Sequence, residues 1–369
     1  MGQLLSGPIT EKQSGDGASQ EMGLVWGYSC MQGWRDRMED AHLAVPSLSS
    51  SVSARKMGYR DQGWGDTAVF AVMDGHGGEN VAHFCARHLP EEVARGSSQD
   101  VKRALRDAFH RMDEMLADPA NLDELNSLSN DPSPKAFKKW QHVNPECIGC
   151  TAVVCCVRRD SIVVANAGDS RAVLCRNGEA VDMSEDHKPN LPSERARIRR
   201  AGGSIMEQRF GSHTQYRVNG NLNLSRSIGD LGYKQNVYLR PQDQIICSTP
   251  DVKHFRRQAG DEFLVLACDG VWDVLSSQEV VDYIRPQLGG LFDSESIYDE
   301  PPVRLSSIVE GLLDRCLSPD LAQTCGLGGD NMTMVLVVLA ENPSSLPGDL
   351  WSGQAGQMLQ ASTWLCPYQ

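Results

Sequence analysis

The sequence has 369 residues, 40% hydrophobic and 22% charged, and its 48 acidic residues against 35 Lys and Arg give a formal net charge of −13. This composition is that of a globular protein with a sizeable core. The acidity excludes a general nucleic-acid binder, which needs a basic face to displace counterions from phosphates.

The first 23 residues are rich in Gly, Ser and Gln, and we expect them to form a flexible leader. They contain no apolar segment typical of a signal peptide, so we expect a cytoplasmic protein whose 12 cysteines are reduced thiols. A nuclear location stays open. The longest apolar run, Met332–Ala340, has the length of a strand and is too short to cross a bilayer.

The opening MGQLLS fits the acceptor pattern for N-myristoylation, in which Gly2 becomes the N-terminus after Met1 is removed. The alternative is an ordinary flexible start, and we favour the acyl group. One myristoyl chain gives only marginal membrane affinity unless a second signal assists it, and no such signal is visible. We therefore expect at most a weak, reversible association with a membrane surface.

Short strand-like segments recur along the chain, and most of them are rich in Val and flanked by Gly, Asn or Asp. They are Ala68–Met73, Thr151–Val157, Ile162–Ala167, Ala172–Cys175, Phe263–Ala267 and Thr333–Leu339. The spacing of the middle segments predicts antiparallel hairpins, with Asn177-Gly178 as a further tight turn.

Helical patterns lie between these strands. They cover Glu79–Arg95, Gln99–Ala117, Glu194–Ala201, Gln278–Leu288 and Val303–Cys316. Ser276 and Glu279 have the spacing of a capping box. Because helices and strands do not alternate regularly, we predict an α+β fold of antiparallel sheets covered by helices, and not a doubly wound parallel sheet. Three polar segments are predicted as insertions: Ser47–Gly63, Asn121–Pro145 and the tail after Ala340.

Three aspartates flank apolar strands: Asp74 in VMDG, Asp269 in ACDG and Asp330 in GGDN. An ionised carboxylate at a buried strand end is costly unless a positive charge neutralises it. If the three meet, their repulsion raises at least one pKa, whereas bound divalent cations keep all of them ionised. Oxygen ligands select hard ions such as Mg²⁺ or Mn²⁺. The alternative is ordinary turn chemistry, because Asp-Gly is a common turn pair.

A series of motifs occurs in order along the chain: GYSCMQGWRDRMEDAH, FAVMDGHGG, GCTAVV, ANAGDSRAVL, EDHKP, LNLSRSIGD, LACDGVWDVLSSQEVVDYI and GGDNMTMVLV. Together they resemble the motifs of the PPM, or type 2C, metal-dependent protein serine/threonine phosphatases. The resemblance covers roughly Gly27 to Val338. It implies a β-sandwich of two antiparallel sheets flanked by α-helices, with a leader at 1–23, a catalytic domain at 24–341, a flap at about 189–216 and a tail at 342–369.

The resemblance also implies a binuclear Mn²⁺ or Mg²⁺ centre with two ions per catalytic site. Asp74 matches the aspartate that bridges both ions, and Gly75 supplies a backbone carbonyl. Asp269 and Asp330 match the outer ligands, and Glu39 matches the acid near the second ion.

Further roles follow from the same resemblance. Asp40 matches an acid that acts through metal-held water. Arg35 matches the arginine that grips the substrate phosphate, and His76 matches the proposed general acid. Asp169 and Asp273 match acids that hold a weaker third ion in some members.

The implied activity is the hydrolysis of phosphoserine and phosphothreonine on proteins by a water that the metal centre activates. The residue types suit this chemistry, because a guanidinium forms a planar fork for phosphate oxygens and an imidazole can protonate a leaving alkoxide. The bland alternatives are a polar helix-start residue for His76 and a surface salt bridge with Asp36 or Glu39 for Arg35. We expect phosphoprotein partners, no nucleic acid and a monomeric chain.

The Arg-rich stretch Glu194–Arg200 lies in the implied flap. A solvated helix face is the favoured interpretation, and attraction of acidic substrates is the alternative. Two rival functions are a pseudophosphatase that only binds partners and an unrelated Mg²⁺-dependent nucleotide-binding enzyme. The first would need a disabled acid set, which is intact here, and the second would need the GxxxxGK[ST] lysine that DGHGG lacks.

Overall fold

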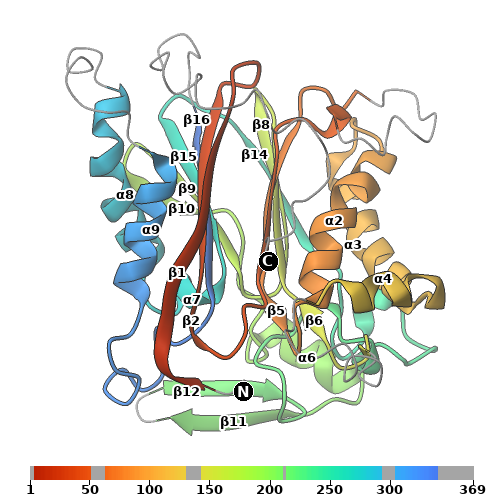
Figure 1. The fold of residues 1–369 in the computed structure, drawn as a ribbon. Helices are drawn as coiled ribbons and strands as arrows, with labels where there is room; N and C mark the ends of the chain where they lie inside the picture. The colour runs from red at the N-terminus through yellow and green to blue at the C-terminus, as the bar shows by residue number, and fades with distance from the viewer. Residues whose placement is uncertain (1–3, 51–62, 130–142, 211–212, 293–303, 340–369) are drawn as a thin grey trace.

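Two antiparallel sheets stand face to face at the centre of the chain (Figure 1). The computed structural model describes residues 4–50, 63–129, 143–210, 213–292 and 304–339. The first sheet has the order β1 (Leu4–Ser19), β2 (Leu24–Arg35), β16 (Met332–Leu339), β15 (Asp261–Ala267), β9 (Arg171–Arg176) and β10 (Glu179–Asp182). The second has the order β14 (Asp251–Arg256), β8 (Ser161–Ala167), β7 (Ala152–Val157), β4 (Ala68–Met73) and β3 (Ala41–Val45).

Helices cover the outer face of each sheet, which confirms the predicted α+β sandwich. The helices on the five-stranded sheet are α2 (Asn80–Arg95) and α3 (Val101–Ala117), with the short α4 (Leu122–Ser127) beside them. The helices on the six-stranded sheet are α8 (Ser277–Phe292) and α9 (Leu305–Cys316). In the described part of the chain, no helix combines the length and the apolar composition that crossing a bilayer requires.

The central strands are buried on both faces, which is why they were recognisable as continuous apolar runs. In β4, Val69 and Met73 pack toward α2 and α3, whereas Phe70 and Val72 pack between the sheets. Successive side chains of a strand point to opposite faces. Each strand of this kind therefore belongs to two hydrophobic layers at once.

Smaller elements gather at one end of the sandwich, the lower end in Figure 1. They are the three-stranded sheet of β13 (Ile228–Gly229), β6 (Gly149–Cys150) and β5 (Gly75–His76), the short helix α7 (Asp269–Trp272), the helix α6 (Pro192–Arg200) and the hairpin of β11 (Ile205–Phe210) and β12 (His213–Val218). The remaining turns are η1 (Leu48–Ser50), η2 (Pro119–Asn121), η3 (Leu231–Tyr233) and η4 (Pro241–Asp243).

Local signals in the sequence have the expected structural consequences. Asn177 and Gly178 both have positive φ, 52° and 82°, and they join β9 to β10 as a tight hairpin turn. The Ser276 backbone N–H donates to Glu279 Oε2 over 2.8 Å and the Glu279 N–H donates to Ser276 Oγ over 3.3 Å. The predicted capping box is thus confirmed at the start of α8.

The predicted flexible leader over residues 1–23 is wrong for its described part, because residues 4–19 form β1. This edge strand pairs with β2 from Leu4 opposite Arg35 to Ser19 opposite Leu24. Its side chains are mostly polar and half exposed, so it carries no apolar alternation. Ladder hydrogen bonds and polar contacts hold it, including one between Ser14 Oγ and Ser29 Oγ of 2.9 Å. Composition therefore could not reveal it.

The segments predicted as insertions are described only in part. The stretch Asn121–Pro145 was predicted as an insertion, and its beginning forms α4, whose Leu125 is buried against the α2–α3 layer. Three ranges lie outside the described residues. They are 51–62 within Ser47–Gly63, 130–142 within Asn121–Pro145, and 340–369, which contains the tail.

Asp16 of β1 caps helix α9 from outside that helix. Its Oδ1 accepts the Ser306 backbone N–H at 2.8 Å and its Oδ2 accepts the Ser306 hydroxyl at 2.6 Å. Arg304, at the N-cap position of α9, makes no side-chain cap bond of its own. The first turn of a helix leaves N–H groups without intrahelical acceptors, so Asp16 supplies what the local sequence lacks.

We predict that Asp16→Ala lowers the free energy of unfolding by about 1–2 kcal/mol, because it removes a helix cap. Asp314→Ala is the matched control: it breaks the ion pair of Lys12 with the exposed Asp314, and pairs of this kind contribute roughly 0.2–1 kcal/mol. Denaturant titration of both variants measures the difference. Equal losses would contradict a capping role for Asp16.

Candidate metal centre

Loops from both sheets meet at the lower end of the sandwich. β2 ends at Arg35, β4 ends just before Asp74, β15 ends just before Asp269 and β16 begins just after Asp330. The pairing of Ala267 with Met334 and of Met332 with Met31 places the ends of β2, β15 and β16 side by side in the six-stranded sheet. Asp74, which follows β4 of the other sheet, lies close to Cys268 at the end of β15. Residues separated by almost 300 positions in the chain are therefore brought to one site.

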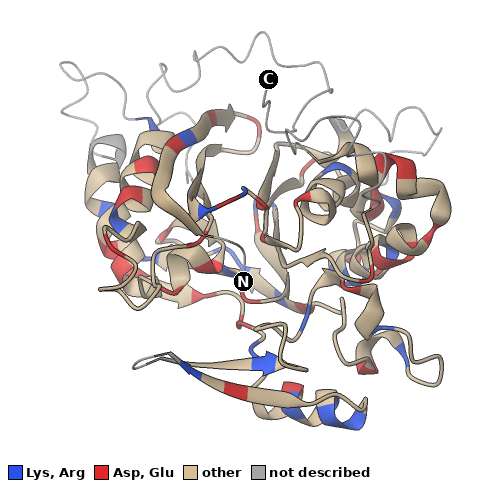
Figure 2. Cartoon of the chain, turned by 60° about the horizontal axis from the view of Figure 1, so that its bottom comes forward, with Lys and Arg blue, Asp and Glu red and all other residues tan. Residues whose placement is uncertain are grey.

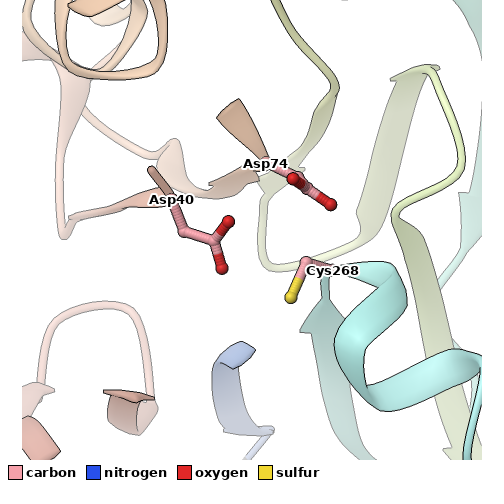
Figure 3. A group of neighbouring side chains, drawn as sticks. All are labelled: Asp40, Asp74 and Cys268. Carbon is pink, nitrogen blue, oxygen red and sulfur yellow. The ribbon is translucent and has the colours of Figure 1, made fainter. Parts of the chain in front are cut away.

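Asp40, Asp74 and Cys268 form the innermost group, and Figure 3 shows their side chains around a common space. One potential ligand atom from each lies within 4.8 Å of the others. Asp40 is buried, and its Oδ2 accepts a hydrogen bond from the Thr333 hydroxyl at 2.7 Å. Its Oδ1 is buried and has no hydrogen-bond partner in the described structure. A buried carboxylate oxygen without a partner is costly, so this atom needs a cation or a proton.

The acids raise one another's pKa. Burial raises the pKa of Asp74 well above its ordinary value, and the charges of Asp40, Asp269 and Asp330 add to the effect. Burial likewise raises the pKa of Asp40, to about 7. Burial also raises the pKa values of Asp269 and Asp330, and the charges of neighbouring carboxylates contribute. The structure therefore brings these four predicted residues together.

The carboxylates of these four aspartates suit divalent cations that prefer oxygen ligands. Carboxylates that repel one another in a buried site are stabilised as anions when such ions bind. Gly75 fits the same reading, because a Cβ at this position would lie 2.2 Å from the Glu39 backbone oxygen. Only glycine allows these two backbone segments to pass so close.

Arg35 forms an ion pair with Asp330. The alternative expectation, a surface salt bridge with Asp36 or Glu39, is not what the structure shows. Arg35 Nη2 lies 2.5 Å from Asp330 Oδ2. Burial alone would lower the pKa of Arg35, but Asp330, Asp74 and Asp269 outweigh it and raise the pKa. The guanidinium is thus fixed beside the acids, with its side chain 32% exposed and able to contact a ligand.

Glu39 is placed by Asn331, a residue that the sequence analysis did not single out. The Glu39 backbone N–H donates to Asn331 Oδ1 at 2.9 Å, and Asn331 Nδ2 donates to the carbonyls of Gln32 and Arg37. Burial raises the pKa of Glu39. The buried Asn331 thus ties the end of β2 and the 36–39 loop to the start of β16, and its only sequence signal is its place in the GGDN motif.

His76 is paired with Asp230, a second residue that the sequence analysis did not assign. His76 Nε2 lies 2.7 Å from Asp230 Oδ2, which also accepts from the Ser227 hydroxyl. Burial alone would lower the pKa of His76, but Asp230 outweighs it and the pKa is raised. The pKa of Asp230 is lowered despite its burial, since His76 favours the carboxylate. The pair therefore favours a protonated imidazole beside a carboxylate.

Asp169 and Asp273 are close neighbours of Asp269. The Asp273 backbone N–H donates to the Asp269 carbonyl at 2.8 Å, one turn along α7. Burial, Asp273 and Asp169 raise the pKa of Asp269, so the three carboxylates are neighbours. Lys188, unassigned from the sequence except as part of EDHKP, reaches this group, with its Nζ 2.5 Å from Asp169 Oδ2.

The segment predicted as a flap lies beside this end of the sandwich, and Figure 2 shows Lys and Arg colouring on α6 and the adjacent hairpin. Burial and the charge of Arg35 lower the pKa of Arg217 in β12, which places the hairpin near Arg35. The favoured interpretation of α6 as a solvated face is wrong for Arg197. This residue is buried and donates to Glu194 Oε2 at 2.6 Å and to the Gln244, Ile245 and Ser225 carbonyls.

Other members of the Arg-rich stretch are exposed, as predicted: Arg195, Arg199 and Arg200. Glu194 compensates the buried Arg197, and Arg226 adds a second guanidinium at 2.7 Å. Burial would raise the pKa of Glu194, but Arg226 and Arg197 lower it to about 2. The helix α6 is therefore anchored by an ion network on one face and open to solvent on the other.

Gly2, the predicted acylation site, lies outside the described residues.

A family model described as Protein phosphatase 2C matches residues 25–318. The chain is 42% identical over 366 residues to "Probable protein phosphatase 2C 58" of Oryza sativa subsp. japonica, covering 91% of this chain and 89% of that protein. It is 40% identical over 344 residues to "Probable protein phosphatase 2C 3" of Paramecium tetraurelia, covering 92% and 99% of the two chains.

Solved structures share the fold at lower identity. A phosphatase from a pathogenic strain of Toxoplasma gondii aligns with a TM-score of 0.60 and 23% identity, over 89% of this chain and 95% of that one. A serine-threonine phosphatase 2C from Toxoplasma gondii aligns with a TM-score of 0.59 and 20% identity, over 92% and 99%. At these identities the structural likeness bears on the fold alone.

Proposed function

The chain belongs to the protein phosphatase 2C family of protein serine/threonine phosphatases, and on that premise we propose that it hydrolyses phosphoserine and phosphothreonine at the acidic end of its sandwich. The proposed catalytic domain is residues 24–341, with the flap at about 189–216. The observation that carries the proposal is the set of carboxylates around the unpartnered Asp40 Oδ1, whose pKa values are raised by burial and by one another's charge.

The general activity of the family is metal-dependent, and the finer assignment of ligands is our proposal. The residues that would hold two Mn²⁺ or Mg²⁺ ions are Glu39, Asp74, the Gly75 carbonyl, Asp269 and Asp330, with Asp40 acting through a bound water and Asp169 and Asp273 holding a weaker third ion. Two such ions, when bound, lower the pKa of water and neutralise phosphate charge. The carboxylates of this chain in turn fix where those charges stand.

Arg35 would bind the phosphate of the substrate. Its guanidinium already lies against an anionic oxygen of Asp330 at 2.5 Å, at the edge of the acid group. A planar guanidinium can donate two parallel hydrogen bonds to phosphate oxygens, which fixes orientation as well as charge. We propose that Arg35 orients the phosphoryl group and that the nearby β12 hairpin limits which protein segments approach it.

His76 would protonate the leaving hydroxyl of serine or threonine. Asp230 engages its Nε2, so Nδ1 is the nitrogen that can deliver the proton. A serine or threonine alkoxide is a poor leaving group, and proton transfer to it by a positioned imidazole typically contributes about 10²–10⁴-fold. Asp230 serves as a positioning residue, because it orients the ring and favours the protonated form.

A pseudophosphatase remains the rival within the same fold. It would keep the sandwich and lose at least one of the charged groups. Arg35, His76, Asp74, Asp269 and Asp330 are all present and lie at one end of the molecule. Their retention favours an active enzyme, for which phosphorylated proteins are the substrates.

Myristoylation of Gly2 is proposed on its acceptor pattern alone. β1 begins at Leu4, so an acyl group on Gly2 would be attached two residues from the edge strand. A single chain of this kind gives weak and reversible membrane binding. We propose a monomeric cytoplasmic protein that binds membrane surfaces weakly and reversibly. A mass spectrum of the native N-terminus without the acyl mass would refute the lipid anchor.

The first functional prediction concerns the metal ligands. Wild-type protein with Mn²⁺ should hydrolyse a phosphothreonine peptide, and both chelation and Asp74→Asn should reduce kcat/KM at least about 10³-fold, or roughly 4 kcal/mol. Asp107→Asn, which changes an exposed aspartate on α3, is the matched control and should retain wild-type activity. Equal activity with Mn²⁺, with chelator and in Asp74→Asn would refute the proposed function.

The second functional prediction concerns proton delivery. Asp230→Asn should lower kcat for the phosphothreonine peptide about 10²-fold, because it removes the group that favours protonated His76. Its effect on p-nitrophenyl phosphate should be far smaller, since nitrophenolate leaves without protonation. Parallel steady-state assays with the two substrates measure this difference. Equal losses on both would show that Asp230 is structural only.

A further inference from the structure

Lys188 places a positive charge inside the outer acid group, which we define as Asp169, Asp269 and Asp273. Its Nζ lies 2.5 Å from Asp169 Oδ2 and 4.0 Å from Asp269 Oδ2. The Asp169 side chain is 2% exposed and that of Lys188 is 31% exposed. The ammonium is therefore the nearest cation to a carboxylate that has almost no contact with water.

The backbone holds this ammonium in position. The His187 N–H donates to the Gly168 carbonyl at 2.9 Å, and the Gly168 N–H donates to His187 Nδ1 at 3.2 Å. Asp186 accepts two hydrogen bonds from Arg171, at 2.9 and 2.7 Å. These contacts fix the 186–188 segment against the turn that carries Asp169, so the position of Lys188 follows from the fold.

The electrostatics of the group agree with the distances. Burial alone would lower the pKa of Lys188, but Asp169, Asp269 and Asp273 outweigh it and raise the pKa. In return, Lys188 opposes the effect of burial on the pKa of Asp273 and of Asp269. Three acidic side chains, one from the turn after β8 and two from α7 and its C-cap, thus share one lysine.

We propose that Lys188 is a tethered counter-ion of the outer acid group and that a third divalent ion must displace its ammonium to bind there. This inference rests on the proposed function, which assigns Asp169 and Asp273 to a weaker third ion. Two cations at the same carboxylate repel each other, and the tether gives the ammonium a high local concentration that a free ion has to overcome. Lys188 therefore sets the low affinity of the outer site without contacting the substrate.

The test is calorimetric titration of the metal-free full chain with Mn²⁺. Lys188→Met keeps most of the side-chain volume and removes the charge, and it should tighten the weak outer site at least about tenfold, or about 1.4 kcal/mol. The two tighter sites should change little. Lys188→Arg keeps the positive charge and should retain weak binding. Lys253→Met, which removes a lysine charge that is ion-paired at 2.9 Å with the exposed Glu185 and not with the outer acid group, is the matched control and should behave as wild type.

A second readout separates a counter-ion from a structural lysine. Metal-free Lys188→Met should melt below wild type, because Asp169 loses its cation, and Mn²⁺ should raise its melting temperature by more than it raises that of wild type. Lys188→Gln, which can still hydrogen-bond to Asp169, should show the same two effects if Lys188→Met folds poorly. Outer-site affinity that is unchanged or weaker in these neutral variants would overturn the inference. If the wild-type protein shows no tight Mn²⁺ binding in the titration, the proposed function would be overturned instead.

Discussion

The crowding of four carboxylates at one end of the sandwich is the constraint on which the rest of this molecule depends. Asp40, Asp74, Asp269 and Asp330 lie at one end of the sandwich, and each has its pKa raised, first by burial. Such an arrangement costs free energy that the fold itself must offset. The two sheets do so by burying apolar side chains in three layers, one between the sheets and one under each helical cover.

Around the acids, fixed positive groups offset part of the negative charge. Arg35 neutralises Asp330 on the inner side, and Lys188 neutralises Asp169 on the outer side. His76 is held by Asp230 at a third position. Each cation reaches the acids from a different segment of the chain, so the metal binding, phosphate binding and proton delivery that we propose could be altered separately by substitution. The two-sided placement would also allow the acidic end to bind a dianionic phosphate group, as we propose.

Much of this could be predicted from the sequence where a signal is local. Buried strands such as β4 are continuous apolar runs, and the Ser276–Glu279 box marks a helix start whatever surrounds it. Partners that meet through the fold could not be predicted. Asp230, Lys188 and Asn331 stood inside motifs, but spacing does not tell which side chain each will contact. The strand β1 was missed because an edge strand held by backbone hydrogen bonds to β2 needs no apolar pattern. The burial of Arg197 was missed because the carbonyls that accept its hydrogen bonds are distant in the sequence.

The proposed function depends on the binding of divalent cations by the carboxylates at the end of the sandwich. Crystals of the full chain soaked in Mn²⁺ and measured at the manganese absorption edge test this most directly. We predict two strong anomalous peaks among the carboxylates of Asp74, Asp269 and Asp330 and the Gly75 carbonyl. Data without peaks in this region, or with manganese bound only elsewhere on the molecule, would contradict the account.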